Sequence, residues 1–384
     1  MKLLHISYDY PDEIDSQKPP AIKKLIDTIG SNFNNYSISL NRTDKIEAQR
    51  RVDGTNLTSM AVFGLPYGLD FRSFLIRAGR AVLRLDLDYK RFDFIFAYKL
   101  TFEGPVAAAI HRKFSVPFII VIRQTDIKVL KYRPDLRGKY RSILNQAAAI
   151  VFPSHWLKQS LEAIIGGNFY DQIIRPKSFL IPNICGMEYN IPAREDNGRY
   201  ICVVSMKKDY YRIKNFDRLI SAFKLAANDN KDIHLDIFGY GEGMDRIRTE
   251  VNRTNMTANI TVNGPVDNKD IPALLSGYRA FIMPSYPETF GLVYVEALRS
   301  GIPIIFAKHT AVEGFFNGYD CQIQVDHTSV ISIYEAISKI EAQHDRYRAE
   351  TARLQSDGIL DMFTSSSVSD AFRHMLESLS TSGL

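Results

Sequence analysis

Two glutamates eight positions apart are the residues best suited to chemistry. Glu288 and Glu296 stand in residues 287–297, which follow an expected strand at residues 280–283 and open an expected helix. Positions eight apart lie on nearly the same helix face, so both carboxylates can point into one cleft and accept hydrogen bonds from sugar hydroxyls. The helix N-terminus between them offers free backbone N–H groups to a diphosphate, at Thr289, Phe290, Gly291 and Leu292. The alternative is that Glu288 compensates the helix dipole and Glu296 lies on the surface.

Alternating strands and helices must position these groups. Strand-like apolar runs occur at residues 3–7, 36–40, 92–97, 117–122, 149–152 and 178–181, and again at 200–205, 234–238, 260–262, 280–283, 302–306 and 321–325. Helical patterns lie between several of them, for example at residues 19–30, 104–114 and 155–165. This alternation predicts an α/β fold with two doubly wound parallel sheets, each covered on both faces.

The polar segment at residues 183–199 lacks apolar periodicity and predicts a linker between two domains. We expect a first domain at residues 1–185 and a second at residues 186–365, with the helical segment at residues 366–384 returning to the first. Ligands of such folds bind outside the carboxyl ends of the strands, so the cleft would lie between the carboxyl edges of the two sheets.

Composition narrows the class of protein. The 384 residues, 45% hydrophobic and 24% charged, are ordinary for two soluble domains. The apolar run at residues 116–122 is far too short to span a bilayer, which predicts a cytoplasmic protein, free or on a membrane surface. Cys185, Cys202 and Cys321 are odd in number and lack a C-x-x-C pattern, which favours buried free thiols. The formal charge is +9 over residues 1–190 and −4 over the rest, so the two halves should have different partners.

Residues 284–305 resemble the E-x7-E region of family four of the retaining glycosyltransferases, which have the GT-B fold of two Rossmann-like domains. The resemblance combines Pro-Ser-x-x-Glu-x-Phe-Gly, a second Glu and Ala-Leu-x-Ser-Gly-Ile-Pro-Ile-Ile. Residues 148–154 and 181–183 are similar to two further landmarks of that family. The resemblance implies that Glu288 contacts the transferred sugar and that Glu296 binds the ribose hydroxyls of the donor nucleotide.

A basic cluster follows the strand at residues 200–205. It contains Lys207, Lys208, Arg212 and Lys214. The family places an Arg and a Lys here to neutralise the donor diphosphate. Lys214 followed by Asn215 matches the Lys position, and Lys207 is the candidate for the Arg position, where Ser-Met-Lys replaces the usual Gly-Arg-Leu. Arg212 would assist at the donor; a solvated loop is the alternative.

The loop at residues 238–242 contains Gly239 and Gly241 between a strand and a helical pattern. It resembles the family's glycine loop, but its spacing does not match G-x-G-x-x-G. Approach to the nucleotide and an ordinary strand-to-helix turn are both open interpretations.

The acceptor side departs further from the family pattern. The usual Gly-Gly loop is replaced at residues 15–20, where Lys18 is the candidate acceptor contact. Asp126 matches the family's Asp after the strand at residues 117–122, and Arg123 stands where many members have His. Asp126 is therefore either catalytic or a cap at the end of the strand.

The predicted activity is transfer of a sugar from a nucleotide diphosphate, with UDP expected, to a hydroxyl of a glycan or lipid-linked glycan. Retention of configuration, a front-face mechanism and a role in cell-surface polysaccharide synthesis are expected. The alternatives are a sugar-nucleotide epimerase or hydrolase, and a non-catalytic nucleotide-sugar binder. No cofactor, metal or nucleic-acid partner is expected. The D-x-D pattern at Asp86 and Asp88 lies on a helical, arginine-rich stretch and favours a solvated face.

A basic amphipathic helix is predicted at residues 71–85. Its apolar face would carry Phe71, Phe74, Leu75, Ala78, Val82 and Leu85, and its basic face Arg77, Arg80 and Arg84. A second basic region follows at residues 128–141, with Lys128, Lys131, Arg133, Arg137, Lys139 and Arg141. Such a surface can bind the anionic inner leaflet of a membrane; a core-packing helix with a solvated arginine face is the alternative.

Overall fold

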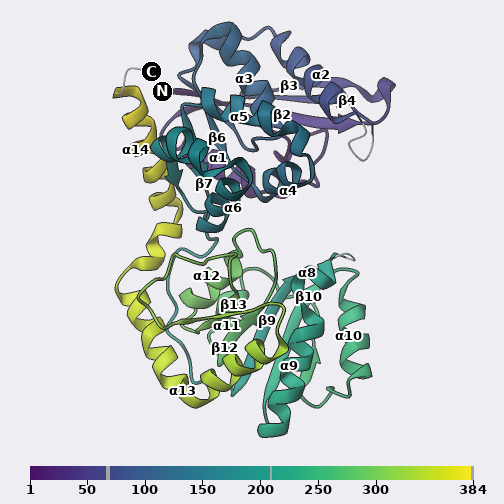
Figure 1. Cartoon of the computed structure of the whole chain (residues 1–384), viewed down its shortest axis with the longest axis vertical. Helices are drawn as coiled ribbons and strands as arrows, with labels where there is room; N and C mark the ends of the chain where they lie inside the picture. Colours follow the sequence, from purple (N-terminus) through teal and green to yellow (C-terminus); the bar gives the residue numbers. More distant parts are fainter. Residues whose placement is uncertain (66–69, 208–209, 382–384) are drawn as a thin grey trace. The chain divides into compact units, whose positions relative to one another are not determined.

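The computed structural model describes residues 1–65, 70–207 and 210–381. Lys208 of the basic cluster and the last three residues of the expected returning segment lie outside the described residues. The chain forms two compact units. The first comprises Met1–Pro153, Leu157–Pro182 and the segment from Ser365; the second comprises Ser154–Trp156 and Asn183–Thr364 (Figure 1).

The first unit is built on an eight-stranded sheet in the order β3-β4-β2-β1-β5-β6-β7-β8. Its strands are β1 Lys2–Ser7, β2 Asn34–Thr43, β3 Arg50–Asp53, β4 Leu57–Phe63, β5 Phe94–Ala97, β6 Phe118–Val121, β7 Ala149–Phe152 and β8 Ser178–Leu180. Every residue of β5, β6 and β7 is buried, as expected for parallel strands covered by helices on both faces.

The edge of this sheet differs from the sequence expectation. Strands β3 and β4 were not predicted, and β3 pairs with β4 antiparallel, so the sheet is not wholly parallel. Strand β3 is short, charged and largely exposed, so it shows no apolar alternation; charged residues on an edge strand protect it from pairing with other chains.

Helices cover both faces of the first sheet. They are α1 Ala21–Gly30, α2 Phe71–Leu83, α3 Glu103–Phe114, α4 Gln124–Tyr132, α5 Arg137–Gln146, α6 His155–Ile165, the short α7 Gly167–Phe169 and α14 Ser365–Thr381. Right-handed crossovers put α2, α3 and α5 on one face and α1 on the other.

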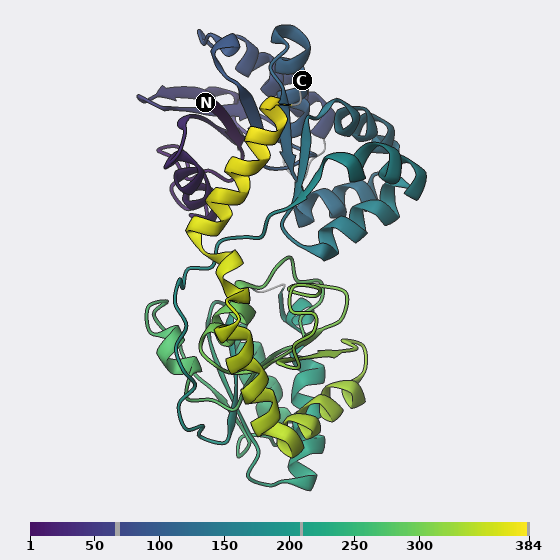
Figure 2. The ribbon, with the colours of Figure 1, turned by 90° about the vertical axis from the view of Figure 1, so that its left-hand side faces the viewer.

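The C-terminal helix α14 packs beside α1, as Figure 2 shows in yellow. Asn32 Nδ2 donates to Ser369 Oγ at 2.9 Å, and the rings of Phe372 and Phe96 have centroids 5.9 Å apart. The end of the chain therefore completes the core of the unit that its beginning forms.

The apolar face of α2 packs into the core, which favours the core-packing alternative over a helix that lies in a membrane headgroup layer. Phe74, Leu75, Ala78, Val82 and Leu85 are buried. Arg77 is also engaged: it pairs with Asp70 and its Nε donates to the carbonyl of Phe63 at 2.9 Å. Only Arg80 and Arg84 of the predicted arginine face are exposed.

The second basic region is divided in the same way. Lys128, Lys131, Lys139 and Arg141 are exposed, whereas Arg133 pairs with Asp135 and Arg137 Nε donates to the carbonyl of Leu130.

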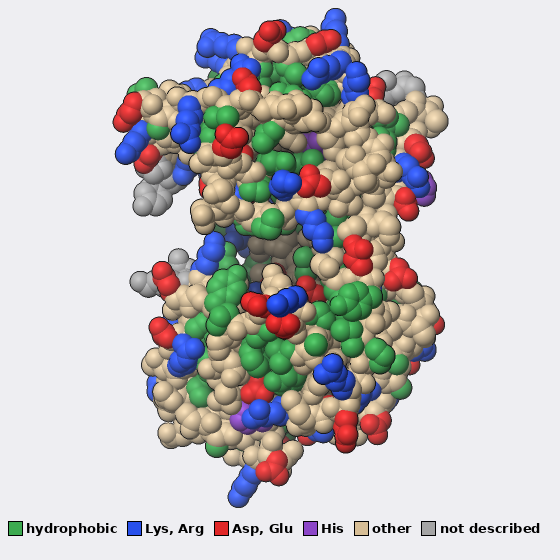
Figure 3. Space-filling model, turned by 180° about the vertical axis from the view of Figure 1, so that it is seen from behind, with side chains coloured by type: hydrophobic (Ala, Val, Ile, Leu, Met, Phe, Trp, Pro, Cys, Tyr) green, Lys and Arg blue, Asp and Glu red, His purple; other side chains and the backbone are tan. Residues whose placement is uncertain are grey.

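On the face seen in Figure 3, charged side chains of both signs are interspersed with apolar ones. Among the described residues, no helix is both long and apolar enough to cross a bilayer.

The second unit has a six-stranded parallel sheet in the order β11-β10-β9-β12-β13-β14. Its strands are β9 Arg199–Ser205, β10 His234–Tyr240, β11 Ile260–Val262, β12 Ala280–Met283, β13 Ile304–Ala307 and β14 Gln322–Val325. Its helices are α8 Tyr211–Lys214, α9 Phe216–Asp229, α10 Met244–Arg253, α11 Ile271–Leu275, α12 Leu292–Arg299 and α13 Val330–Ser356. The three cysteines are free and buried in this unit, and burial raises the pKa of Cys202 and Cys321 to about 12.

The strand order of the second sheet reverses between β9 and β12. From β9 the chain runs outward through β10 to β11, and it then returns to β12 and runs outward the other way through β13 to β14. Neighbouring loops therefore diverge at the carboxyl ends of β9 and β12, which is where ligands of open α/β sheets bind.

Candidate active site

A tight turn at Gly291 sets the position of the two glutamates. Helix α12 begins at Leu292, and Gly291, at φ +73°, is its N-cap. A Cβ on Gly291 would lie 2.4 Å from the ring of Tyr294, so only glycine fits there. Glu288 consequently lies in the loop before the helix, as predicted. Glu296 lies about one turn inside the helix and not two, so helix periodicity does not relate the two carboxylates.

The loop between the glutamates is anchored by Phe290. Its side chain is 2% exposed and its ring centroid lies 5.7 Å from that of Phe315 and 5.8 Å from that of Phe363. Phe290 therefore holds the loop in the core, and it would present backbone rather than side chain to a ligand. Leu292 and Thr289 are partly exposed on either side.

Glu288 and Lys214 form the charged centre of this edge. Lys214 Nζ lies 2.8 Å from Glu288 Oε2, with the two side chains 15% and 18% exposed. Ser285 Oγ donates to the same oxygen at 3.1 Å, and the backbone N–H of Thr289 donates to Oε1 at 3.2 Å. Lys214 follows β9 and Glu288 follows β12, so the pair lies at the point where the strand order reverses.

Thr310 fixes the backbone of Glu288 and was not anticipated from the sequence. Its Oγ1 accepts from the Glu288 N–H and donates to the Glu288 carbonyl, both at 2.6 Å, and the N–H of Ala311 donates to that carbonyl at 2.9 Å. Ser285 is the serine of the Pro-Ser-x-x-Glu-x-Phe-Gly pattern, and the sequence did not indicate its contact with Glu288. Ser285 and Thr310 follow the predicted strands β12 and β13. A place just after the carboxyl end of a strand was the feature of the sequence that could have identified them as site residues.

Glu296 differs from Glu288 in having no partner among the described residues. No side-chain hydrogen bond or ion pair joins its carboxylate to any described residue, and burial raises its pKa. A carboxylate that is shielded from water and left without a donor is suited to accept hydrogen bonds from a ligand.

Lys207 and Arg212 of the basic cluster are more exposed than Lys214. Lys207 lies over the ring of Tyr210, with Nζ 5.9 Å from its centroid, and Arg212 projects from α8. No carboxylate of the described residues pairs with either side chain. These two cations are therefore free to meet an anion, whereas Lys214 already holds Glu288.

The glycine loop has a packing explanation. A Cβ on Gly239 would lie 2.4 Å from the carbonyl oxygen of Val204, and one on Gly241, at φ +106°, would lie 2.2 Å from that of Met206. Both glycines let the end of β10 approach the backbone after β9, which supports the interpretation of an ordinary turn.

At the carboxyl edge of the first sheet, Asp126 is buried and fully hydrogen bonded. Its Oδ1 accepts from the N–H of Thr101 at 2.8 Å and from Thr101 Oγ1 at 2.6 Å, and its Oδ2 accepts from the N–H of Arg123 at 2.9 Å. These bonds cap α4 and join it to the loop after β5. The geometry favours capping over catalysis for Asp126.

Other ionisable side chains at this edge are also wholly or partly buried. Burial lowers the pKa of Arg123 and of Lys18, and Lys18 Nζ lies 3.4 Å from the carbonyl oxygen of Leu40. Glu103, missed in the sequence, is wholly buried; burial raises its pKa to about 8, and its Oε1 accepts from the N–H of Tyr8 at 2.7 Å. Its Oε2 has no hydrogen-bond partner among the described residues.

A cavity of about 380 Å³ opens at this edge and offers a surface for an acceptor. Three phenylalanines and two arginines line it together with two further residues: Arg42, Asp70, Phe71, Phe74, Phe102, Val129 and Arg133. Aromatic rings and planar cations are side chains that can pack on and hydrogen-bond to a sugar. None of these residues was singled out for an acceptor role from the sequence, although Phe71, Phe74 and Arg133 were assigned to the membrane surface.

The D-x-D pattern has a local structural role. Asp88 caps the short 3₁₀ turn Tyr89–Arg91, accepting from the N–H of Lys90 at 3.1 Å, and Asp86 is exposed. Within the described residues, no three His, Cys, Asp or Glu side chains gather as metal ligands would.

Comparison with known proteins identifies the second unit. Residues 190–354 match the family model described as glycosyl transferases group 1. Two relatives match by sequence: the UDP-N-acetylglucosamine–peptide N-acetylglucosaminyltransferase GtfA subunit of Streptococcus gordonii, 25% identical over 43% of this chain, and the poly(glycerol-phosphate) alpha-glucosyltransferase of Bacillus subtilis, 27% identical over 37%. The matched segments span 33% and 21% of those relatives.

The whole chain is similar in structure to sucrose-phosphate synthase from Thermosynechococcus elongatus. The TM-score is 0.73 with 16% identity, and the similarity covers 100% of both chains. At that identity the likeness establishes the fold, which is GT-B, as the sequence predicted. The family match covers the unit that carries Glu288, Lys214 and Glu296, so this second unit belongs to the glycosyl transferases group 1.

Proposed function

We propose that the protein transfers a sugar from a uridine diphosphate sugar to a hydroxyl group of a glycan or lipid-linked glycan, retaining the anomeric configuration and using no metal ion. The observation that carries the proposal is the pairing of Glu288 with Lys214 where the strand order reverses, beside a Glu296 carboxylate that lacks a described partner. The name of the streptococcal relative, a UDP-N-acetylglucosamine–peptide N-acetylglucosaminyltransferase subunit, supports the choice of donor.

Each group has a distinct role in the proposed donor complex. Glu296 accepts hydrogen bonds from the ribose hydroxyls, because its carboxylate has no hydrogen-bond or ion-pair partner among the described residues. Glu288 accepts from hydroxyls of the transferred sugar. Lys214 has further N–H donors beyond the one used by Glu288 and can therefore hold the sugar-binding carboxylate and the diphosphate together.

The leaving diphosphate is stabilised by fixed positive charge. Lys207, Lys214 and Arg212, with the first N–H groups of α12, supply donors where negative charge develops as the bond between the sugar and the diphosphate breaks. The acceptor oxygen forms the new bond to the same anomeric carbon on the same face, and its proton passes to the departing diphosphate. This front-face course needs no protein base, which agrees with the burial of Asp126.

The proposed acceptor surface is the aromatic and basic cavity of the first unit, with Arg42 and Arg133 as the polar contacts. The name of the Bacillus relative, which acts on a poly(glycerol phosphate), supports an acidic polymer as one class of acceptor and cell-surface polysaccharide synthesis as the setting. Action in the cytoplasm, with the first unit on an anionic inner leaflet, is part of the proposal. The exposed Arg80 and Arg84 would make that contact, and the apolar face of α2 would not.

The test incubates the full chain with UDP-sugars in the presence and absence of glycan, lipid-linked glycan and teichoic-acid-type acceptors. NMR of the product reports the anomeric configuration. The proposal expects acceptor-dependent release of UDP and an α-linked product from an α-linked donor. Donor consumption that is equal without acceptor would instead identify an epimerase or a hydrolase. Donor binding without turnover under any condition would identify a non-catalytic binder.

A further inference from the structure

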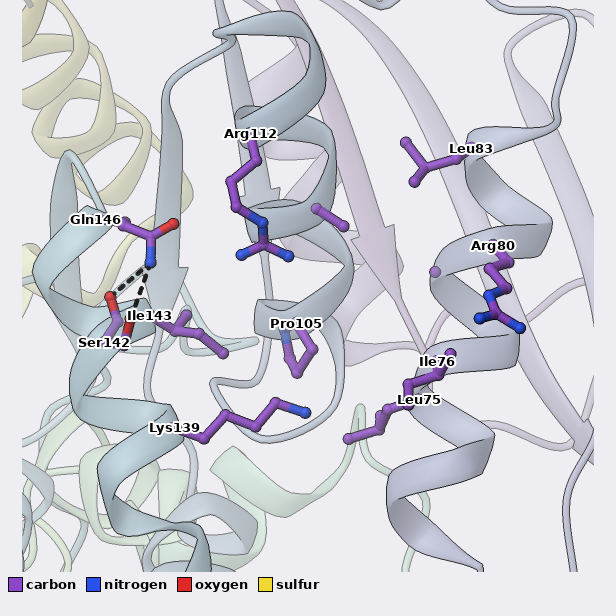
Figure 4. Close-up of a pocket in the computed structure, with 12 residues that line it drawn as sticks. Leu75, Ile76, Arg80, Leu83, Pro105, Arg112, Lys139, Ser142, Ile143 and Gln146 are labelled. Carbon is purple, nitrogen blue, oxygen red and sulfur yellow. Dashed lines mark hydrogen bonds between the residues drawn. The ribbon is translucent and has the colours of Figure 1, made fainter.

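The first unit contains a groove that the proposed transfer does not use. It lies among α2, α3 and α5 on one face of the sheet and has a volume of about 370 Å³ (Figure 4). Helix α3 contributes only Pro105 and Ala109 to its centre, and these small side chains leave space between α2 and α5.

The interior of the groove is apolar. Leu75 and Ile143 are buried at its walls, and Leu83 continues the apolar lining along α2. Ile76, at the rim, is 51% exposed, which is unusual for a large aliphatic side chain on a helix that packs against a core. A narrow apolar channel of this kind matches a hydrocarbon chain.

Gly79 keeps the groove open. It lies in the middle of α2, where glycine destabilises a helix by roughly 1 kcal/mol relative to alanine. Nothing lies within 4 Å of the position that its Cβ would occupy, so no neighbour in the core demands glycine there. The absent side chain leaves space in the groove itself.

Cations without carboxylate partners surround this apolar space. Arg112 and Lys139 project over it from α3 and α5, and Arg80 lies on the α2 side (Figure 4). No ion pair joins any of the three to a described carboxylate, whereas Arg72 and Arg77 on the same α2 helix pair with Asp135 and Asp70. Burial, with the charges of Arg72 and Arg112, lowers the pKa of Lys139. The groove therefore has an excess of positive charge.

We propose that this groove binds an anionic lipid, with one hydrocarbon chain between α2 and α5 and a phosphate headgroup on Arg112, Lys139 and Arg80. The two halves of the site match the two halves of such a molecule: apolar walls receive the chain, and unpaired cations receive the charge. The inference does not depend on the proposed sugar transfer, because binding is measured without donor or acceptor.

The probe is a monoacyl lysophosphatidate held below its critical micelle concentration and titrated calorimetrically into the full chain. Inorganic phosphate carries the headgroup chemistry alone, and lysophosphatidylcholine of the same chain length lacks the net negative charge. Lysophosphatidate should bind at least about tenfold more tightly than either control, a difference of about 1.4 kcal/mol. Equal binding of phosphate or of the choline lipid would overturn the proposal, and so would the absence of lysophosphatidate binding.

Two sets of variants locate the site. Gly79→Leu fills the groove and should abolish lysophosphatidate binding, whereas Gly79→Ala, its control, stabilises the helix similarly but leaves most of the space. The double variant Arg112→Glu, Lys139→Glu should weaken binding at least about tenfold for the loss of charge-assisted hydrogen bonds. Lys113→Glu is its control, because Lys113 is exposed on α3 and does not line the groove. Circular dichroism confirms that each variant is folded. Undiminished binding in folded Gly79→Leu, or equal loss in Lys113→Glu, would contradict the assignment.

Discussion

The carboxyl edges of the two sheets differ in where their charged groups are engaged. In the second unit, Glu288 and Lys214 are paired but partly exposed, and Glu296 has no described partner. In the first unit, Asp126 and Glu103 are buried within the protein. Both edges carry the residue types that the resemblance requires. Of these four carboxylates, Glu288 and Glu296 are the ones left within reach of a ligand, so residue type indicates a candidate and the surroundings decide its role.

The largest effect should come from breaking the pair in the second unit. Glu288→Ala and Lys214→Ala should each lower kcat by about 10²–10³-fold, because they remove contacts that stabilise the transition state. For Glu288→Ala the loss should appear in kcat more than in donor affinity, since its proposed partner is the transferred sugar. Steady-state kinetics with the identified UDP-sugar measure this. Unchanged kcat in folded variants would remove the pair from the mechanism.

Glu296→Ala should act on donor binding. Loss of a charged acceptor for ribose hydroxyls costs about 1.5–3 kcal/mol, which weakens binding of UDP by about 10- to 100-fold. Calorimetric titration with UDP checks this without requiring an acceptor. Ser300→Ala on the same helix is the matched control, because Ser300 Oγ contacts only the backbone carbonyl of Glu296. An unaltered affinity for UDP would place the ribose elsewhere.

Substitution of Asp126 should change the free energy of unfolding and not kcat. Asp126→Asn removes an acceptor from the Arg123 N–H and should lower the free energy of unfolding by about 1–3 kcal/mol. The folded fraction should retain the kcat of the native chain. Denaturant unfolding and active-site titration separate these quantities. A collapse of kcat at unchanged stability would restore Asp126 to the chemistry.

Glu103 should make stability depend on pH. Its pKa is raised to about 8, so the folded chain binds a proton more tightly than the unfolded chain, and stability falls as pH rises from about 4.5 to about 8. Glu103→Gln should reduce that fall. Thermal unfolding of both proteins between pH 5 and pH 8 gives the comparison; parallel curves would show that Glu103 does not titrate in this range.

The smallest expected effect is that of a chelator. Cations of the protein and helix N–H groups serve the diphosphate in the proposed mechanism, so EDTA should leave the rate within about twofold of the untreated value, an energy difference below about 0.5 kcal/mol. The assay is initial rate with and without EDTA. Loss of activity that manganese restores would return attention to Asp86 and Asp88.

Much of the fold could be predicted from the sequence because buried parallel strands are nearly continuous apolar runs. All twelve predicted runs became strands, including β5, β6 and β7. The edge strand β3 was missed because an exposed charged strand has no such signal, whereas β4 was missed although its residues are largely buried. The returning helix α14 was foreseen as a helix, whereas its contact with α1 depends on side chains distant in sequence.

For the site, the sequence by itself determined the chemistry available: Glu288, Glu296 and Lys214, with their spacing and their resemblance to one family, predicted the fold and family that the comparisons then showed. Tertiary structure alone decided how those groups are held. Thr310 fixes Glu288 through contacts between loops that follow different strands, Ser285 adds a hydrogen bond within the loop of Glu288, and Gly291 starts the helix one turn before Glu296. Asp126 is buried and Glu288 is partly exposed. Solvent exposure depends on which residues pack over a side chain, and the local sequence does not specify those residues.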